Sequence, residues 1–193
     1  MVNVAIFASG SGTNFENLVS KDYVYANICL LVVDKENAYA INRAIKLGVP
    51  YVYVNPKAFA SKKEYEEKIV EYLKVYEIDV IALAGYMRFI GEVLLHTYPN
   101  KIINLHPAYL PAFPGAHSIM DAYIAKAKYS GVTLHYVDEG IDTGKIIYQE
   151  KLWIDQAWSF EEFEAKIHEL EYQLFPDVLE RVCKEVEYVK STY

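Results

Sequence analysis

Continuous apolar runs alternate with amphipathic segments along the first half of the chain. The runs cover residues 2–8, 28–33, 51–54 and 80–84. Uninterrupted apolar runs are typical of strands buried on both faces of a parallel sheet. With helices between them, they predict a doubly wound, mostly parallel Rossmann-like α/β sheet with right-handed crossovers.

The predicted helices have recognisable starts and apolar faces. Residues 15–19 and 38–47 follow the first two strands. Ser61 with Glu64, and Ser159 with Glu162, have the spacing of capping boxes and mark the starts of two longer helices. Apolar residues recur at helical spacing after both boxes, so each helix is expected to bury one face.

The second half of the chain has a different pattern. A helix is predicted around residues 118–126, followed by strand-like runs at 131–137 and 145–152. The connection between these runs is too short for a helical crossover, so they are expected to pair antiparallel. We therefore predict one domain over residues 1–193, in which antiparallel strands and a long C-terminal helix continue the sheet.

Composition narrows the class of protein. A hydrophobic fraction of 53% and a charged fraction of 23% exclude wholesale disorder. The net charge of -7 argues against nucleic acid or an anionic membrane as a partner. Cys29 and Cys183 lack metal-ligand spacing, and the first apolar run is too short for a signal peptide. We expect a cytoplasmic protein, monomeric or homodimeric.

The stretch 101–115 is the strongest candidate for chemistry. Asn104 and His106 lie two residues apart on a predicted strand, so their side chains leave the same face. The prolines that follow stiffen the loop, although a capped, proline-rich connection would show the same pattern. Asp142, in the glycine-flanked loop 140–144, would favour a protonated His106 if it faces that residue; otherwise it is an ordinary turn residue.

Two other loops follow strands of the predicted sheet. The glycine-rich turn 9–14 aims backbone N–H groups at a phosphate, or is simply a tight turn. Asp34, after the second strand, resembles the ribose-binding acid of dinucleotide domains, but the third glycine of that fingerprint is missing. In the loop 85–90, Arg88 lies among apolar residues, which is typical of a pocket wall for a flat ligand.

The remaining candidates are an amide, an imidazole and a carboxylate. No Ser, Cys or Lys has a base arranged for covalent catalysis, and no metal-ligand spacing is present. Asn104 and a protonated His106 therefore suit direct acyl-type transfer through a tetrahedral intermediate. His135, within a predicted strand, is interpreted as structural at least as readily as functional. His168 and Glu171, three apart on the closing helix, are expected to share an exposed stripe.

These motifs together resemble the folate-dependent formyltransferases. The specific part is Asn104-Leu-His-Pro, followed by residues 110–115 and, at the expected distance, residues 140–144. The resemblance covers residues 4 to about 176 and is strongest to members that formylate glycinamide ribonucleotide (GAR) in purine synthesis. It implies the formyltransferase fold, 10-formyltetrahydrofolate as co-substrate and no metal.

The resemblance also implies roles for individual residues. The catalytic trio would be Asn104, His106 and Asp142. The residues that bind GAR would be Gly12, Thr13, Asn14 and Glu171, with His168 where relatives usually carry Gln. The residues that bind the formyl-folate would be Lys62, Met87, Arg88, Phe89, Ile90 and Asn104.

Three alternatives lead to different expectations. Methionyl-tRNA formyltransferases carry a further tRNA-binding domain, and formyltetrahydrofolate hydrolases carry a further N-terminal domain. The predicted fold begins at Val2 and the chain ends at Tyr193, so we expect GAR rather than tRNA or water as the acceptor. A non-catalytic nucleotide-binding module would use Asp34 and be indifferent to changes at His106.

Overall fold

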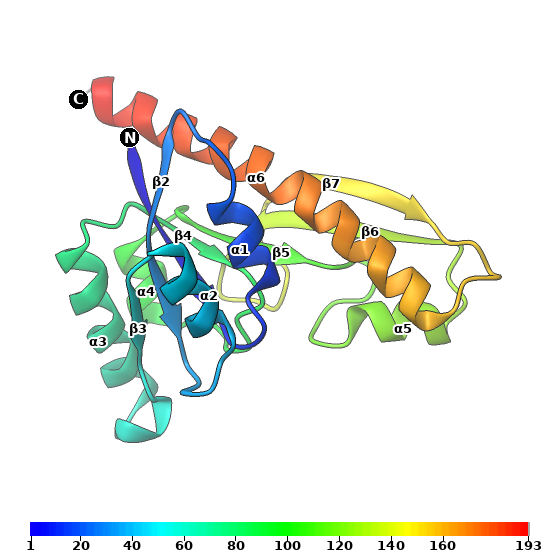
Figure 1. Cartoon of the computed structure of the whole chain (residues 1–193), viewed down its shortest axis with the longest axis horizontal. Helices are drawn as coiled ribbons and strands as arrows, with labels where there is room; N and C mark the ends of the chain where they lie inside the picture. Colours follow the sequence, from blue (N-terminus) through cyan, green and yellow to red (C-terminus); the bar gives the residue numbers. More distant parts are fainter. Residues whose placement is uncertain (193) are drawn as a thin grey trace.

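A computed structural model of the chain describes residues 1–192, which form one seven-stranded sheet with helices on both faces (Figure 1). The strand order is β3-β2-β1-β4-β5-β6-β7. The parallel strands are β1 (Val2–Ala8), β2 (Ala26–Val33), β3 (Tyr51–Tyr53), β4 (Val80–Leu83) and β5 (Ile102–His106). The antiparallel strands are β6 (Tyr129–Tyr136) and β7 (Ile146–Trp153). The predicted fold class is confirmed.

The helices that join these strands differ from the prediction mainly at their ends. They are α1 (Thr13–Val19), α2 (Ala40–Leu47), the 3-10 turn η1 (Pro56–Ala58), α3 (Lys62–Val75), α4 (Glu92–Thr97), α5 (Ser118–Ile124) and α6 (Phe160–Thr192). The sequence pattern missed α4, because a helix of 6 residues is too short to show a period. None of the helices in residues 1–192 combines the length and apolar composition needed to cross a membrane.

Both predicted capping boxes form their backbone caps. Ser61 Oγ accepts a hydrogen bond from the Glu64 N–H at 3.2 Å, and Ser159 Oγ accepts one from the Glu162 N–H at 3.2 Å. The Glu162 carboxylate also accepts a hydrogen bond from the Ser159 N–H at 2.7 Å. These bonds satisfy N–H groups that a helix cannot satisfy internally, and so fix where α3 and α6 begin.

The apolar runs are continuous because the sheet has a hydrophobic core on each face, so successive side chains are buried in one core or the other. Along β1, Val4 and Ile6 belong to the core under α1, α2, α5 and α6. Ala5 and Phe7 point the other way, into the core under α3 and α4. All four side chains are fully buried. Truncating such a residue, for example Phe7→Ala, would cost about 3–5 kcal/mol of stability.

The topology creates a crevice between β1 and β4. The chain runs outward from β1 to β3 and then returns to the other side of β1 with β4. In open α/β sheets, ligands bind beyond the carboxyl ends of the strands at such a reversal. The turn after β1 and the loop after β4 meet there, where the Ser9 N–H donates to the Gly85 carbonyl at 3.1 Å.

Candidate active site

A cavity of about 760 Å³ opens at this edge of the sheet. Its walls come from the turn 9–14, the loop 83–90, the end of β5 and the loop 137–142. Helix α6 closes it with His168 and Glu171. Every residue to which the family resemblance assigns a catalytic or binding role lines this one cavity.

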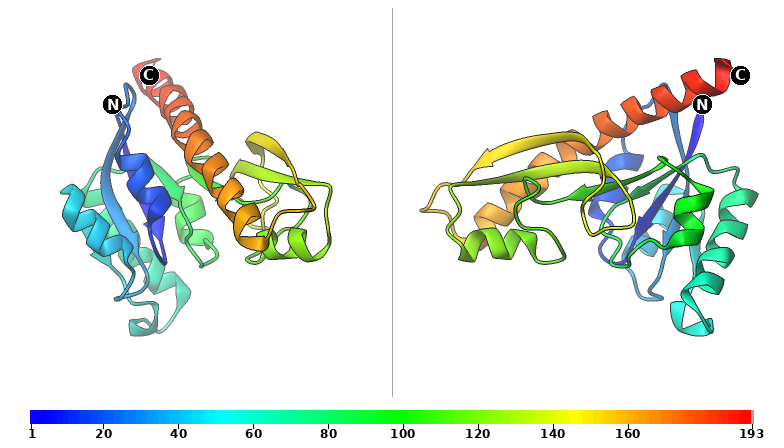
Figure 2. Two further views of the ribbon diagram at one scale, coloured as in Figure 1. Left: turned by 45° about the vertical axis from the view of Figure 1, so that its right-hand side comes forward. Right: turned by 180° about the vertical axis from the view of Figure 1, so that it is seen from behind.

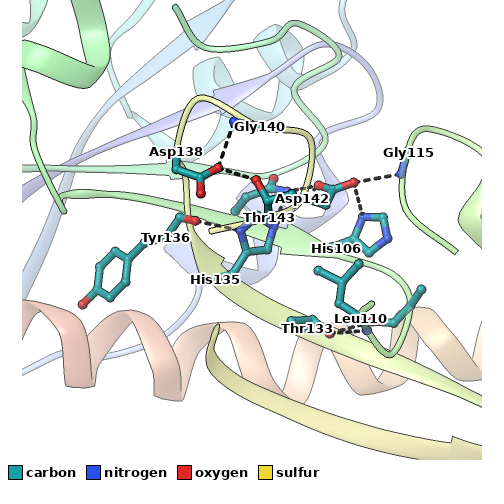
Figure 3. Close-up of polar contacts among 12 residues, drawn as sticks. His106, Leu110, Gly115, Thr133, His135, Tyr136, Asp138, Gly140, Asp142 and Thr143 are labelled. Carbon is teal, nitrogen blue, oxygen red and sulfur yellow. Dashed lines mark hydrogen bonds and ion pairs between the residues drawn. The ribbon is translucent and has the colours of Figure 1, made fainter. Parts of the chain in front are cut away.

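The structure brings Asn104, His106 and Asp142 together, and Figure 3 shows the Asp142 carboxylate directed at the His106 ring. Asn104 and His106 project from the same face of β5, and Asp142 reaches them from the β6–β7 loop. Asp142 Oδ2 lies 3.4 Å from His106 Nδ1 and accepts a hydrogen bond from the Gly115 N–H at 2.8 Å. Its Oδ1 lies 3.5 Å from Asn104 Nδ2. The predicted juxtaposition is therefore present.

The loop that carries Asp142 is closed on itself. Asp138 Oδ1 accepts hydrogen bonds from the Gly140 N–H at 3.0 Å and the Thr143 hydroxyl at 2.7 Å. Asp142 has a left-handed backbone, with φ 53, which short polar residues such as Asp tolerate. At Gly144, a Cβ atom would lie 1.7 Å from the Tyr136 carbonyl oxygen, so a glycine is required there. Local bonds thus hold the carboxylate in place.

Asp142 is the charged member of the cluster. The His135 ring 3.6 Å from Oδ1, the Gly115 N–H and the charge of the nearby imidazoles outweigh burial and lower the pKa of Asp142 to about 2. Burial lowers the pKa of His106, although the Phe113 carbonyl and Asp142 oppose this effect. Burial thus favours the neutral His106 imidazole in the resting site, whereas the two acceptors that face its ring nitrogens favour the charged form. The protonated His106 expected from the sequence stays a prediction.

The hydrogen bonds of His106 define its tautomer. Its Nε2 lies 2.8 Å from the Phe113 carbonyl oxygen, which can only accept, so Nε2 carries the proton. In the neutral ring, Nδ1 is then an unprotonated base directed at Asp142. The side chain is only 4% exposed. His106 is therefore suited to take up a proton at Nδ1, where a carboxylate would stabilise the resulting charge.

His135 is a site residue that the sequence interpretation did not single out. It pairs directly with Asn104 across β5 and β6, so the two side chains share a face. Its Nδ1–H donates to the Tyr136 carbonyl at 2.8 Å, and its Nε2 lies 3.2 Å from Asn104 Nδ2. His135 therefore orients the amide. The signal was present, because Thr133 and His135 alternate like Asn104 and His106, but the strand register was not known.

The turn between β1 and α1 forms the other end of the cavity. Gly12 has a left-handed backbone, with φ 76, and a Cβ atom there would lie 2.6 Å from Ala40 Cβ. Asn14 Nδ2 donates to Glu171 Oε2 at 3.0 Å, while Asn14 Oδ1 is buried without a hydrogen-bond partner in residues 1–192. Thr13 begins α1 and also lines the cavity. An unpaired acceptor here suits a ligand that donates hydrogen bonds.

The expectation of one exposed stripe at His168 and Glu171 is wrong. Glu171 is 3% exposed, because α6 packs this face against the turn that contains Asn14. The His168 side chain remains 41% exposed, and its Nδ1 lies 2.8 Å from Glu171 Oε2. The hydrogen bond to Glu171 raises the pKa of His168. The pair therefore presents a polar, partly charged surface to the cavity.

The residues expected to contact the folate form a separate wall. They are Lys62, Met87, Arg88, Phe89 and Ile90, and all of them line the cavity. Met87 and Phe89 are 62% and 68% exposed, which leaves a flat apolar surface open to a ligand. Arg88 Nε lies 2.8 Å from Asp34 Oδ2. The carboxylate expected to bind ribose in the dinucleotide alternative is therefore already paired.

In the part of the chain that the structure describes, no group of three or more His, Cys, Asp or Glu side chains could hold a metal ion. The chemistry available in the cavity is hydrogen bonding, proton transfer and charge stabilisation by the cluster around Asp142.

This fold and this cluster have counterparts in a known family. Residues 2–179 match the Formyl transferase family, and the chain belongs to it. Among its relatives is the phosphoribosylglycinamide formyltransferase of Bacillus subtilis (strain 168). It is 44% identical over 185 residues, a match that covers 94% of this chain and 95% of that protein.

Solved structures agree with this assignment. Glycinamide ribonucleotide transformylase 1 from Geobacillus kaustophilus superposes with a TM-score of 0.91 at 46% identity, covering 95% of this chain and 99% of that one. The phosphoribosylglycinamide formyltransferase from Streptococcus pneumoniae TIGR4 superposes with a TM-score of 0.90 at 43% identity, covering 94% and 99%. The resemblance inferred from the sequence motifs is confirmed.

Proposed function

We propose that this chain is a cytoplasmic GAR formyltransferase of purine biosynthesis. It transfers the formyl group of 10-formyltetrahydrofolate to the primary amine of GAR, and the products are formyl-GAR and tetrahydrofolate. The observation that carries the proposal is a single cavity that joins the turn 9–14, the Asp142 cluster and the apolar loop 85–90. The relatives named above are described by the same activity.

GAR is proposed to enter at the end of the cavity formed by β1 and α6. Its phosphate would accept hydrogen bonds from the backbone of Gly12, Thr13 and Asn14, because the backbone N–H groups of such turns suit an anion. Its ribose hydroxyls would donate to Glu171, with His168 beside it. The glycinamide amine would then lie toward Asn104 and His106, which line the same cavity.

The formyl donor is proposed to occupy the opposite wall. The flat pterin ring would lie against the loop that contains Met87, Phe89 and Ile90, with Asn104 at its inner edge. Lys62, at the start of α3, would meet the negatively charged end of the folate. Lys62 makes no ion pair within residues 1–192, so its charge is available.

The reaction is proposed to proceed by direct attack. The amine nitrogen of GAR forms a bond to the formyl carbon, and the carbonyl electron pair moves to oxygen. Asn104 Nδ2 would stabilise this oxyanion with the N–H that now makes the long 3.5 Å contact to Asp142. The intermediate collapses when the carbon–N10 bond breaks and its electron pair returns to N10 of tetrahydrofolate.

One proton must move from the amine to N10. Neutral His106 is proposed to accept it at Nδ1, directly or through a water molecule, and then to release it to N10. Asp142, ionised because its pKa is about 2, would stabilise the transient imidazolium from 3.4 Å. Since His106 is buried, its charged form would depend on the Phe113 carbonyl at Nε2 and on that carboxylate for stabilisation.

The proposal is tested by the choice of acceptor. Purified enzyme is given 10-formyltetrahydrofolate with GAR, with charged initiator tRNA or with neither, and the release of tetrahydrofolate is followed. We expect rapid release of tetrahydrofolate only in the reaction that contains GAR as the acceptor. Rapid release with tRNA or with water would assign the chain to another formyl-folate enzyme, and donor consumption indifferent to His106→Ala would refute the mechanism.

A further inference from the structure

Asp34 has no part in the reaction just described, yet its carboxylate is among the most buried in the protein. The side chain is 2% exposed, and Oδ2 lies 2.8 Å from Arg88 Nε. The other oxygen, Oδ1, is buried without a hydrogen-bond partner in residues 1–192. A buried carboxylate with one cationic partner strongly favours the conformation that keeps that partner in place.

The pair bridges the crevice between the two halves of the doubly wound sheet. Asp34 follows β2, and Arg88 lies in the loop after β4, with β1 between these strands. The contact therefore spans the point where strand order reverses, at the mouth of the cavity. Through this contact, Asp34 can fix the position of the loop 85–90 relative to the sheet.

Other bonds hold the two ends of the same loop but not its tip. The Met87 N–H donates to Ser9 Oγ at 2.9 Å, and Tyr86 and Tyr65 share a hydroxyl hydrogen bond of 2.6 Å. Beyond the loop, the Gly91 N–H donates to Glu66 Oε1 at 2.5 Å. Between these anchors, the exposed side chains of Met87 and Phe89 flank Arg88. Arg88 is thus the side chain that ties the tip down.

We propose that Asp34 is a positioning residue for the formyl donor, and that Arg88 is a tether rather than a ligand for the donor's carboxylates. By holding Arg88, Asp34 keeps the apolar face of the loop in the shape that receives the pterin ring. Lys62, which lines the same wall without an ion pair in the described residues, supplies the charge for the negative end. This inference rests on the proposed function and assigns the parts of its donor site.

A comparison of two formyl donors distinguishes an Arg88 that tethers the loop from an Arg88 that binds the donor's carboxylates. The first is 10-formyltetrahydrofolate, and the second is the primary amide of 10-formyltetrahydropteroate, which lacks the glutamate and carries no carboxylate. Asp34→Asn keeps the shape of the side chain and removes its charge. If Asp34 acts as a tether, this change weakens both donors by about tenfold, the lower end for a lost hydrogen bond between charged groups. The values of kcat and of KM for GAR stay within about twofold, as for a loss of uniform binding.

Lys62→Gln is the matched control, because it removes a charge from the same wall. It should weaken the donor that carries glutamate and leave the uncharged pteroate amide unaffected. If Arg88 instead binds the donor's carboxylates, Asp34→Asn frees its guanidinium. The glutamate-bearing donor then keeps or gains affinity while the uncharged pteroate amide is unchanged, and that result would overturn the proposal.

A double-mutant cycle with Asp34→Asn and Arg88→Gln checks that the two residues act together. The double variant should lose no more donor affinity than either single variant, since one tether is cut in each. Additive losses would contradict the tether. Donor affinity is read directly by fluorescence titration without GAR, with thermal melting to verify folding. A wild-type enzyme inactive toward GAR would therefore count against the proposed function alone.

Discussion

The two halves of the sheet contribute to the cavity in different ways. In the parallel half, the ends of β1 and β4 provide backbone turns, held by contacts such as Ser9 to Gly85 and Asp34 to Arg88. The antiparallel half begins with β5, which is parallel to β4 but antiparallel to β6. There, side chains on facing strands converge, as Asn104 on β5 does with His135 on β6. Figure 2 shows β6 and β7 extending away from the parallel strands, so the cavity lies at their junction.

The contrast teaches that binding and chemistry are separated in the fold. Backbone turns recognise the ends of a substrate equally well before and during reaction, so changes there should alter KM. Side chains around the reacting carbon matter most in the transition state, so changes there should alter kcat. The predictions below test this division, from the largest expected effect on catalysis to the smallest.

The largest effects are expected in the antiparallel half. Asn104→Ala, His106→Ala and Asp142→Asn should each lower kcat on the order of a hundred- to a thousandfold, because each removes a transition-state donor, base or counter-charge. KM for both substrates should change little, as steady-state kinetics will show. His96→Ala, on the exposed face of α4, serves as the control and should behave as wild type. Unchanged turnover in His106→Ala would contradict the comparison.

In the parallel half, Gly12→Ala should raise KM for GAR by about ten- to a hundredfold with kcat nearly preserved. The new Cβ atom would meet Ala40 and strain a left-handed backbone, which costs about 1–3 kcal/mol and displaces the turn. The melting temperature of this variant should also be lower than that of the wild type. Gly10→Ala is the control for stability, since no atom lies within 4 Å of its Cβ position. A fall in kcat alone would break the proposed division.

The sequence predicts the parallel half better than the antiparallel half. Buried parallel strands appear as continuous apolar runs, and the turn 9–14 is local, so its contribution follows from neighbouring residues. Asn104 and His106 were predicted as a pair for the same reason. Their link to His135 depends on strand register, and the burial of Glu171 depends on how α6 packs. Neither feature can be predicted from the spacing of neighbouring residues, since each is a contact between segments far apart in the sequence.

His135→Gln tests whether the missed residue orients the amide. Loss of the imidazole should lower kcat by about tenfold, less than loss of Asn104 itself, because the amide remains but is held less firmly. It should also raise the pKa of Asp142 toward its ordinary value, since the contact with His135 is the main cause of the low value. The acid limb of the pH profile of kcat should shift upward. If kcat of His135→Gln is lowered equally at every pH, so that its pH profile keeps its shape, the role of His135 is purely structural.

The last prediction concerns the stability of the fold in acid and involves no change in catalysis at neutral pH. The pKa of Asp142 is about 2 in the folded chain against 3.8 ordinarily, so its ionised form stabilises the fold above pH 4. That contribution, on the order of 2 kcal/mol, should disappear as the pH falls from about 4 to 2. Urea midpoints at pH 5 and pH 3 measure it. In Asp142→Asn the difference between these midpoints should shrink, and an equal difference would exclude Asp142 as its source.

Helix α6 connects the two halves that the kinetics separate. It packs against α1, β1 and β2 on one side of the junction and against α5, β6 and β7 on the other, and Figure 1 shows it crossing the length of the sheet. Its buried residues run from Phe163 to Cys183. Neither half can come apart without exposing that stripe to water, so the two fold and unfold as one cooperative unit. Amide hydrogens in the middle of α6 should therefore exchange with solvent only when the whole molecule opens.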